Sequence, residues 1–389
     1  MTADAGGTAG TTVVVVDDSL VQRRFLRLAL ADVPGCVVVG EARNGREAVA
    51  LVQRLRPKVV LMDLDLPNHA GQDAIEQIMA TAPTPIVVTS AYISDGSQTG
   101  ADALQAGAID LIAKPVAGDR EALDAYADQV RALVKVASRA RVITHPRARL
   151  AAKLGHVPPR QRTPVADSVP RPVAAAVAAK AAERSAAPAV PRITGGERSH
   201  VRLVVVGSST GGPAALVTLL SGLPSDLPVP VLVVQHMSPG FVTGLAAWLD
   251  EQVTLPVTVG RSFVQLEPGT VTLAPDGENT TIDALLRVRL KPPAPGQLHV
   301  PSVDATFHSA ASILGPMALG VLLTGMGRDG AAGLKAMHST GAHTIAQDEV
   351  SSVVWGMPGQ AVSMGAAVEI LPLEEIAPSI VHVIAEGES

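Results

Sequence analysis

Residues 201–220 read VRLVVVGSSTGGPAALVTLL, and this stretch decides the fold of the C-terminal half of the chain. An apolar run at 201–206 ends in a turn of Gly, Ser and Thr residues, and a second apolar run with Pro213 near its start follows. This pattern predicts a buried strand, a tight turn and a helix, in that order. Such units build the parallel sheets of α/β proteins, in which helices cover both faces.

The same pattern recurs further along the chain. Apolar strands are expected at 229–234 and 318–323, and each ends in a polar or glycine-rich turn. Open α/β sheets place their sites at the carboxyl ends of the strands. We therefore expect residues 200–389 to form one doubly wound parallel-sheet domain with its site at that edge.

Residues 11–140 predict a second α/β domain of the same class. Continuous apolar strands alternate with helices, which is typical of a parallel sheet that is buried on both faces. Strands are expected at 13–16, 36–39, 59–62, 86–89 and 111–113, and helices at 20–31, 45–54, 71–80, 100–106 and 120–140.

Residues 141–199 differ in composition from both flanking regions. They contain eight prolines, eleven Lys or Arg residues and only three Asp or Glu residues. Few large apolar side chains are available for a core, so a long, basic and flexible linker is predicted. A solvated tether is the simpler interpretation, although contact with an acidic surface stays open.

Composition excludes several classes of protein. The formal net charge of −5 over 389 residues gives no reason to expect nucleic-acid binding. Cys36 is the only cysteine, so neither an intramolecular disulfide nor a Cys-x-x-Cys site is possible. Residues 1–10 lack the features of a signal peptide, and no apolar run reaches the length of a membrane span. We expect a soluble, cytoplasmic protein that does not insert into a membrane.

Carboxylates follow two strands of the N-terminal domain. Asp17 and Asp18 come after the first strand, and Asp63 comes after the third. Thr89 ends the fourth strand and Lys114 the fifth, so all five side chains are expected at one sheet edge. Clustered carboxylates need a cation, and oxygen ligands suit Mg²⁺. A carboxylate nucleophile, a metal, a lysine and a hydroxyl together predict an acyl-phosphate site.

The strings VVVVDDS, VVLMDLDLPNHAG, IVVTSA and GAIDLIAKP resemble the flavodoxin-like receiver domain of two-component response regulators. The resemblance implies that Asp63 accepts phosphate from a histidine kinase, because it lies four residues before Pro67. Asp65 is then expected to be its exposed neighbour. Leu111 stands where receivers often carry an aromatic switch residue. The resemblance further implies Mg²⁺ ligation by Asp17, Asp18 and Asp63, and phosphate contacts from Thr89 and Lys114.

In the C-terminal domain, residues 207–211 fit the pattern G-x-S-x-G, which places Ser209 on a sharp turn at a helix N-terminus. The helix N-terminus offers amide groups to an oxyanion. A turn of this kind also suits a phosphate or nucleotide, but no P-loop lysine or G-x-G-x-x-G spacing is present. Ser208 is a second possible nucleophile by its chemistry alone.

A serine nucleophile needs a base and a group that orients the base. His236 directly follows the strand at 229–234, at the same sheet edge as Ser209, and Asp329 lies in a glycine-rich turn after the strand at 318–323. The order Ser, His, Asp differs from the order in α/β-hydrolases. Competing candidates for the two roles are His299, His308, His338 and His343, and Asp276, Asp304 and Asp348.

The strings GSSTGG, QHMSPGF, HVPSVDATFHS, LLTGMGRDGAAG, TIAQDE and GMPGQAV resemble, in this order, the Rossmann-like catalytic domain of the CheB family of chemotaxis methylesterases. The resemblance implies a serine hydrolase with Ser209 as nucleophile, His236 as base and Asp329 as orienting carboxylate. It also implies an oxyanion-hole amide in the Met326 region and no cofactor in the catalytic domain. Val300 departs from the family, which often has arginine there.

The resemblance implies a phosphorylation-activated enzyme of chemosensory adaptation. It would hydrolyse glutamate methyl esters of methyl-accepting chemoreceptors and deamidate certain receptor glutamines, under the control of a chemotaxis histidine kinase. We expect the unphosphorylated receiver to inhibit the catalytic domain. Two other functions stay open: a non-catalytic regulator that uses the same fold to bind a receptor, and a response regulator with a nucleotide-binding output domain.

Overall fold

The computed structural model describes residues 10–67, 70–91, 98–115, 119–140 and 201–386. The predicted linker at 141–199 lies outside these residues. The chain divides into two compact units, one around each sheet, and each unit is described here by itself.

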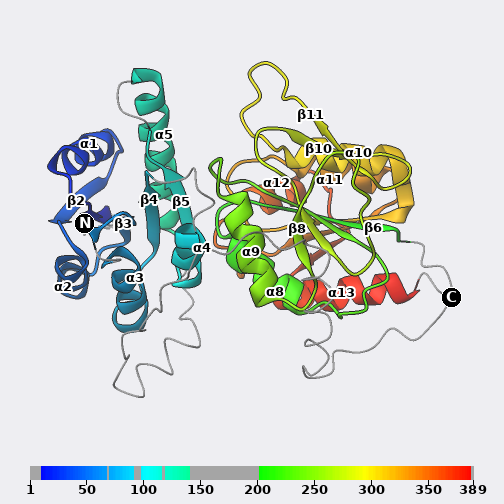
Figure 1. The fold of residues 1–389 in the computed structure, drawn as a ribbon, viewed down its shortest axis with the longest axis horizontal. Helices are drawn as coiled ribbons and strands as arrows, with labels where there is room; N and C mark the ends of the chain where they lie inside the picture. Colours follow the sequence, from blue (N-terminus) through cyan, green and yellow to red (C-terminus); the bar gives the residue numbers. More distant parts are fainter. Residues whose placement is uncertain (1–9, 68–69, 92–97, 116–118, 141–200, 387–389) are drawn as a thin grey trace, which may run out of the picture. The chain divides into compact units, whose positions relative to one another are not determined.

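The N-terminal unit contains a five-stranded sheet with the order β2-β1-β3-β4-β5, and all of its neighbouring strands are parallel (Figure 1). Strands β1 and β3 are neighbours in the sheet, and the direction in which the chain winds reverses between them. The strands are β1 (Thr11–Val16), β2 (Cys36–Ala42), β3 (Val59–Asp63), β4 (Ile86–Ser90) and β5 (Asp110–Ala113).

Helices cover both faces of this sheet. Successive residues of a strand point to opposite faces, so Val13 and Val15 pack with α1 and α5, whereas Val14 and Val16 pack with α2 and α3. The helices are α1 (Leu20–Ala31), α2 (Gly45–Leu55), α3 (Ala70–Thr81), α4 (Gln98–Gln105) and α5 (Arg120–Ala137).

Strand β2 extends three residues beyond the predicted end at Val39. It lies at the edge of the sheet, and its side chains alternate between half-buried and exposed over most of its length. An edge strand tolerates a glycine and a glutamate such as Gly40 and Glu41, which interrupt the apolar pattern that predicts buried strands.

The C-terminal unit contains a seven-stranded parallel sheet with the order β14-β13-β12-β6-β7-β9-β8. Strands β10 and β11 form a separate antiparallel pair. The strands are β6 (Leu203–Ser208), β7 (Val231–Gln235), β8 (Val257–Val259), β9 (Val271–Leu273), β10 (Asn279–Ile282), β11 (Val288–Lys291), β12 (Ala318–Leu322), β13 (His343–Gln347) and β14 (Glu369–Leu371).

One face of this sheet packs against α10, α11 and α12 in a continuous apolar core that contains Phe307 and Leu334. Helices α8 and α13 contact each other and cover the opposite face (Figure 1). The helices are α8 (Gly212–Ser221), α9 (Val242–Gln252), α10 (Val303–Leu314), α11 (Ala331–Ser339), α12 (Met357–Ser363) and α13 (Leu373–Glu386), with a short 3-10 turn at Gly315–Met317.

The two sheets confirm the predicted fold class of two doubly wound α/β domains. In the C-terminal unit, β6 lies between β7 and β12, so the winding reverses at β6. A crevice forms at such a reversal, beyond the carboxyl ends of the strands. The turns that follow β6, β7 and β12 all lie at this edge of the sheet, beside the reversal. None of the helices in the described ranges is both long enough and apolar enough to span a bilayer.

Candidate functional site

Ser209 lies in the turn between β6 and α8 and is half-buried. Its amide donates to the Thr324 carbonyl at 3.0 Å, which ties the turn to the strand end of β12. Gly211 caps α8 with a φ of 78°, in the left-handed region that favours glycine, and a Cβ there would lie 2.6 Å from Val353. The small residues of this turn are therefore required by the backbone and by close packing.

A buried carboxamide joins the Ser209 turn to the neighbouring turn after β7. The side-chain nitrogen of Gln235 donates to the Ser209 carbonyl at 2.8 Å and to the His236 carbonyl at 2.7 Å. Its oxygen accepts the Ser208 hydroxyl at 2.6 Å. The Ser208 hydroxyl is fully buried and engaged, so of the two adjacent serines it is Ser209 that has access to solvent.

His236 and Asp329 are in direct contact. The Nε2 atom of His236 lies 2.8 Å from Oδ2 of Asp329, and both side chains are nearly buried. The carboxylate also accepts the Val303 amide at 2.8 Å, the Ser302 hydroxyl at 3.0 Å and the Asp304 amide at 3.1 Å. These donors belong to the first turn of α10, so Asp329 caps that helix from another part of the chain.

This environment keeps Asp329 ionised. Burial acts to raise its pKa, but the hydrogen bond from His236, together with the amides of Asp304 and Val303, holds the pKa well below its ordinary value. An ionised carboxylate only accepts, so Nε2 of His236 carries the proton. The Nδ1 atom is then the free, basic nitrogen, and it is buried with no hydrogen-bond partner among the described residues.

Asp304 is close to Asp329 but has different surroundings. Burial and the Asp329 charge raise its pKa, while the Gly333 amide, which donates to it at 2.6 Å, acts in the other direction. Asp304 thus joins α10 to α11, and Asp329 is the carboxylate that contacts the imidazole of His236.

The turn after β12 lies against Ser209. A Cβ on Gly325 would be 2.8 Å from the Ser209 Cβ, so glycine permits this close approach. The amide of Thr324 donates to the Gln347 side chain at 2.8 Å, and its hydroxyl donates to the Thr210 carbonyl at 3.0 Å. Met326 follows in this held turn and is half-buried.

The remaining candidate bases occupy different places. His299 stacks on His236, with ring centroids 4.6 Å apart and planes 6° from parallel. His308 lies within α10 and His338 in the last turn of α11. His343 begins β13 and lies 2.6 Å from Glu369. Of these four histidines, His299 is the one whose ring packs on His236.

Asp348, another of the candidate carboxylates, directly follows β13. Its side chain accepts the amide and the hydroxyl of Ser351, at 2.9 and 2.6 Å. These contacts account for the carboxylate as part of a turn.

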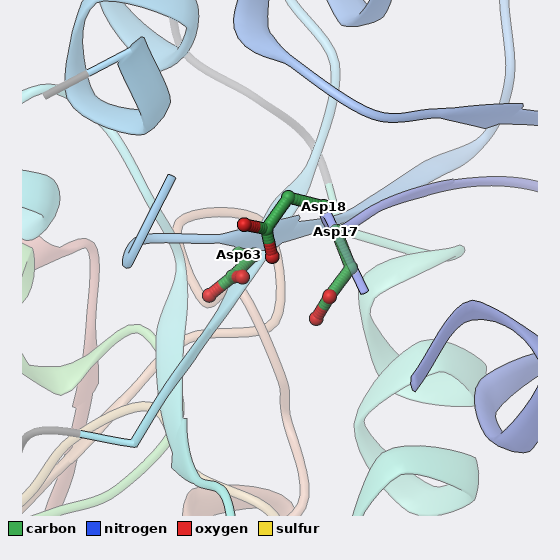
Figure 2. A group of neighbouring side chains, drawn as sticks. All are labelled: Asp17, Asp18 and Asp63. Carbon is green, nitrogen blue, oxygen red and sulfur yellow. The ribbon is translucent and has the colours of Figure 1, made fainter. Parts of the chain in front are cut away.

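The N-terminal unit brings three predicted carboxylates together. Carboxylate oxygens of Asp17, Asp18 and Asp63 all lie within 4.8 Å of one another at the ends of β1 and β3 (Figure 2). The Lys114 ammonium is 2.7 Å from Asp63 and 2.9 Å from Asp17. This lysine, at the end of β5, neutralises part of the clustered charge.

The acidic cluster has the donor set of a hard divalent cation. Burial raises the pKa of Asp63 to about 6 although the Lys114 ammonium acts to lower it, and the Asp17 charge adds to the rise. One ammonium thus leaves the three carboxylates incompletely neutralised. Oxygen ligands in this arrangement fit Mg²⁺, which keeps several waters and takes only a few protein carboxylates.

Thr89 is buried and lies beside Asp63 in the register of β3 and β4. The prediction that Asp65 is simply exposed is wrong. Asp65 is half-buried, and its carboxylate accepts the Ser90 hydroxyl at 3.0 Å and the Ala91 amide at 2.6 Å. It therefore ties the loop after β3 to the end of β4.

Three residues that support the two sites are not predicted from the sequence: Gln235, Ser302 and Arg23. The Arg23 guanidinium is buried and donates to the carbonyls of Asp17 and Asp18, at 2.7 and 3.1 Å. A usable signal exists only for Ser302, a Ser just before an apolar helical pattern, which is typical of an N-cap. Gln235 and Arg23 act through backbone carbonyls that folding brings to them.

Both units are similar to known proteins. The family model described as CheB methylesterase matches residues 204–380, and the model described as response regulator receiver domain matches residues 13–127. A protein-glutamate methylesterase/protein-glutamine glutaminase of Symbiobacterium thermophilum is 38% identical and covers 96% of this chain and 97% of its own. A protein of Myxococcus xanthus with the same description, numbered 4, is 38% identical, covering 94% of each chain.

One solved structure is similar to the C-terminal part. The crystal structure of the Thermotoga maritima CheB methylesterase catalytic domain is 35% identical and covers 47% of this chain and 99% of that chain, with a TM-score of 0.46.

Proposed function

The chain belongs to the CheB methylesterase family, and we propose that Ser209, His236 and Asp329 carry out its reaction as nucleophile, general base and orienting carboxylate. The enzyme is a protein-glutamate methylesterase and protein-glutamine glutaminase under the control of a receiver domain. The observation that carries the assignment is the contact of His236 with an ionised Asp329 at the winding reversal where the Ser209 turn also opens.

In the first half of the reaction, Ser209 Oγ attacks the carbonyl carbon of a glutamate methyl ester. Nδ1 of His236 takes the hydroxyl proton, because Nε2 already donates to Asp329. The tetrahedral intermediate collapses when His236 returns this proton to the leaving oxygen. Methanol departs, and the glutamyl group remains bound to Ser209 as an ester.

In the second half, water attacks the acyl-enzyme. His236 removes a proton from this water and then returns it to Ser209, so that free enzyme and a glutamate carboxylate are regenerated. A glutamine substrate follows the same course with ammonia as the leaving group. The other proton of the water stays on the new carboxylic acid and is lost to solvent. The reaction as written needs no cofactor in the catalytic domain, since His236 carries the transferred proton in each half.

The oxyanion is stabilised by backbone amides. The Met326 amide lies in the turn that Gly325 brings against Ser209, and we assign it one oxyanion contact. The N-terminus of α8 begins three residues after Ser209 and adds the positive end of its dipole. Removal of one such donor typically costs a factor of ~10²–10³ in kcat.

The receiver site supplies the control. We assign Asp63 as the residue that accepts phosphate from a histidine kinase, with Asp17, Asp18 and Asp63 as ligands of Mg²⁺. When bound, Mg²⁺ would neutralise charge on the transferred phosphoryl group. Lys114, which contacts Asp63 and Asp17, would bind a phosphoryl oxygen, and the Thr89 hydroxyl would accompany it.

The finer assignments follow from this scheme. We assign methyl-accepting chemoreceptors as the substrates, the chemotaxis histidine kinase as the phosphodonor and the cytoplasm as the place where the protein works. We assign residues 11–140 to the receiver, 141–199 to a linker and 200–389 to the catalytic domain. Neither nucleic acid nor membrane insertion has a part in this scheme.

Methanol release from methylated receptor cytoplasmic fragments tests the proposal. Wild type, Ser209→Ala and Asp63→Asn would be compared with and without acetyl phosphate. We expect release that is abolished by Ser209→Ala and stimulated by acetyl phosphate only when Asp63 is intact. Ser221→Ala, at an exposed serine that ends α8, is the matched control.

The alternative results separate the two halves of the proposal. Methanol release that requires Ser209 but is the same with and without an intact Asp63 would support the hydrolase assignment and contradict control by phosphorylation. No release from wild type under any condition would reject the assignment of the three catalytic residues and favour a non-catalytic regulator.

A further inference from the structure

We propose that His299 is a positioning residue for the proposed esterase reaction: its ring, stacked on that of His236, fixes the plane of the general base. The two rings lie 4.6 Å apart between centroids and only 6° from parallel. His299 belongs to the segment before α10 and His236 to the turn after β7, so the contact joins distant parts of the chain. The inference depends on the catalytic role assigned to His236.

The base has one hydrogen bond to hold it and needs a second constraint. Nε2 of His236 contacts Asp329, whereas Nδ1 has no partner among the described residues. A hydrogen bond at one ring atom orients that atom, but it does not by itself fix the plane of the ring. Stacking over the face of the ring fixes this plane and keeps Nδ1 aimed in one direction. Proton transfer depends strongly on such alignment.

The backbone of His299 is itself held by a carboxamide pair. Gln297 donates to the His299 carbonyl at 2.7 Å. Gln297 and Asn279 exchange two hydrogen bonds, at 2.8 and 2.9 Å. The Asn279 oxygen also accepts the Ser302 amide at 3.0 Å, and the Ser302 hydroxyl contacts Asp329. One short segment therefore supports both constraints on His236.

The geometry argues against His299 as a second base for His236. Ring N–H groups lie in the plane of an imidazole, so two nearly parallel stacked rings do not hydrogen bond to each other. Partial burial lowers the pKa of His299, which favours a neutral ring. A neutral aromatic ring can stack on His236 both before and after His236 takes a proton.

Steady-state kinetics of the full-length protein, activated with acetyl phosphate, tests this role. The variants are His299→Ala, which removes the ring, and His299→Phe, which restores an aromatic face without nitrogens. From the usual strength of aromatic pairs we expect His299→Ala to lower kcat roughly two- to tenfold with little change in KM. His299→Phe should recover most of this loss. Leu298→Ala, at an adjacent residue that is 91% exposed, is the control for the segment.

Four outcomes would overturn the proposal. These are an unchanged kcat in His299→Ala, a loss seen only in KM, a kcat for His299→Phe as low as for His299→Ala, and an equal loss in Leu298→Ala. Thermal unfolding of each variant separates misfolding from lost alignment. Failure of the enzyme assignment is distinct, because wild type would then release no methanol at all.

Discussion

The Val303 amide donates to Asp329 at 2.8 Å through the same carboxylate oxygen that His236 contacts, also at 2.8 Å. One oxygen thus joins the N-terminus of α10 to the proposed general base. The helix amides and dipole favour the ionised carboxylate, and the ionised carboxylate favours the tautomer that leaves Nδ1 basic. Stability of the catalytic unit and alignment of the site therefore depend on the same group.

Asp329→Asn should impair both properties. The new amide group would face backbone N–H donors that now contact an oxygen, so we expect a loss of about 1–3 kcal/mol in the free energy of unfolding. The imidazole would lose the acceptor that fixes its tautomer, and kcat should fall by a factor of about 10³ or more. Urea unfolding and methanol release measure the two effects. The exposed Asp226→Asn serves as control, and equal behaviour of the two variants would contradict the prediction.

The depressed pKa of Asp329 makes a prediction about pH. The unfolded chain takes up a proton near the ordinary pKa of about 3.9, while folded Asp329 remains ionised at that pH. This contribution to stability is present above about pH 4 and is lost progressively as pH falls toward the folded-state pKa. The slope from one such group is at most about 1.4 kcal/mol per pH unit.

Both tryptophans, Trp248 and Trp355, lie in the catalytic unit, so tryptophan fluorescence during urea unfolding follows this unit in the full-length protein. We expect the free energy of unfolding to fall as the pH is lowered below about 4, the ordinary pKa of the group. The fall should be smaller in Asp329→Asn. An unchanged slope in that variant would show that other carboxylates account for the acid sensitivity.

Gln235 offers a test of how the nucleophile and the base are kept together. In Gln235→Met the shape is largely retained, but the carbonyls of Ser209 and His236 lose their common donor and the Ser208 hydroxyl loses its acceptor. We expect kcat to fall about tenfold or more, since small displacements of reacting groups are costly. Methanol release with KM determined separately measures this. The exposed Gln360→Met is the control, and a change confined to KM would oppose the interpretation.

Arg23 makes a corresponding prediction for the receiver. Arg23→Met would leave the carbonyls of Asp17 and Asp18 without their buried donor, so the two carboxylates should lose their alignment. We expect phosphorylation by acetyl phosphate to need a higher Mg²⁺ concentration, which incorporation of labelled phosphate measures. Arg24→Met changes the next residue of the same helix, which is exposed. Equal Mg²⁺ dependence of the two variants would count against a role for Arg23.

Much of this architecture follows from strand ends. Apolar strands can be predicted from the sequence. Parallel strands that end at one edge of a sheet bring together the residues that follow them. That argument is enough to gather Asp17 with Asp63, and His236 with Asp329. The sequence does not predict the surroundings of Asp65, because Ser90 and Ala91 reach it only through the pairing of β3 with β4.

The sequence by itself determined the two doubly wound domains, the strand-end candidates and the family resemblance, because hydrophobic pattern and glycine-rich turns are local properties. Only the tertiary structure decided which carboxylate contacts His236, which of its nitrogens is free and which ring stacks on it. Asp304 and Asp329 are 25 residues apart, yet hydrogen bonds bring them to one helix end. Such choices depend on side-chain directions and on backbone groups that meet when the sheet and its helices pack.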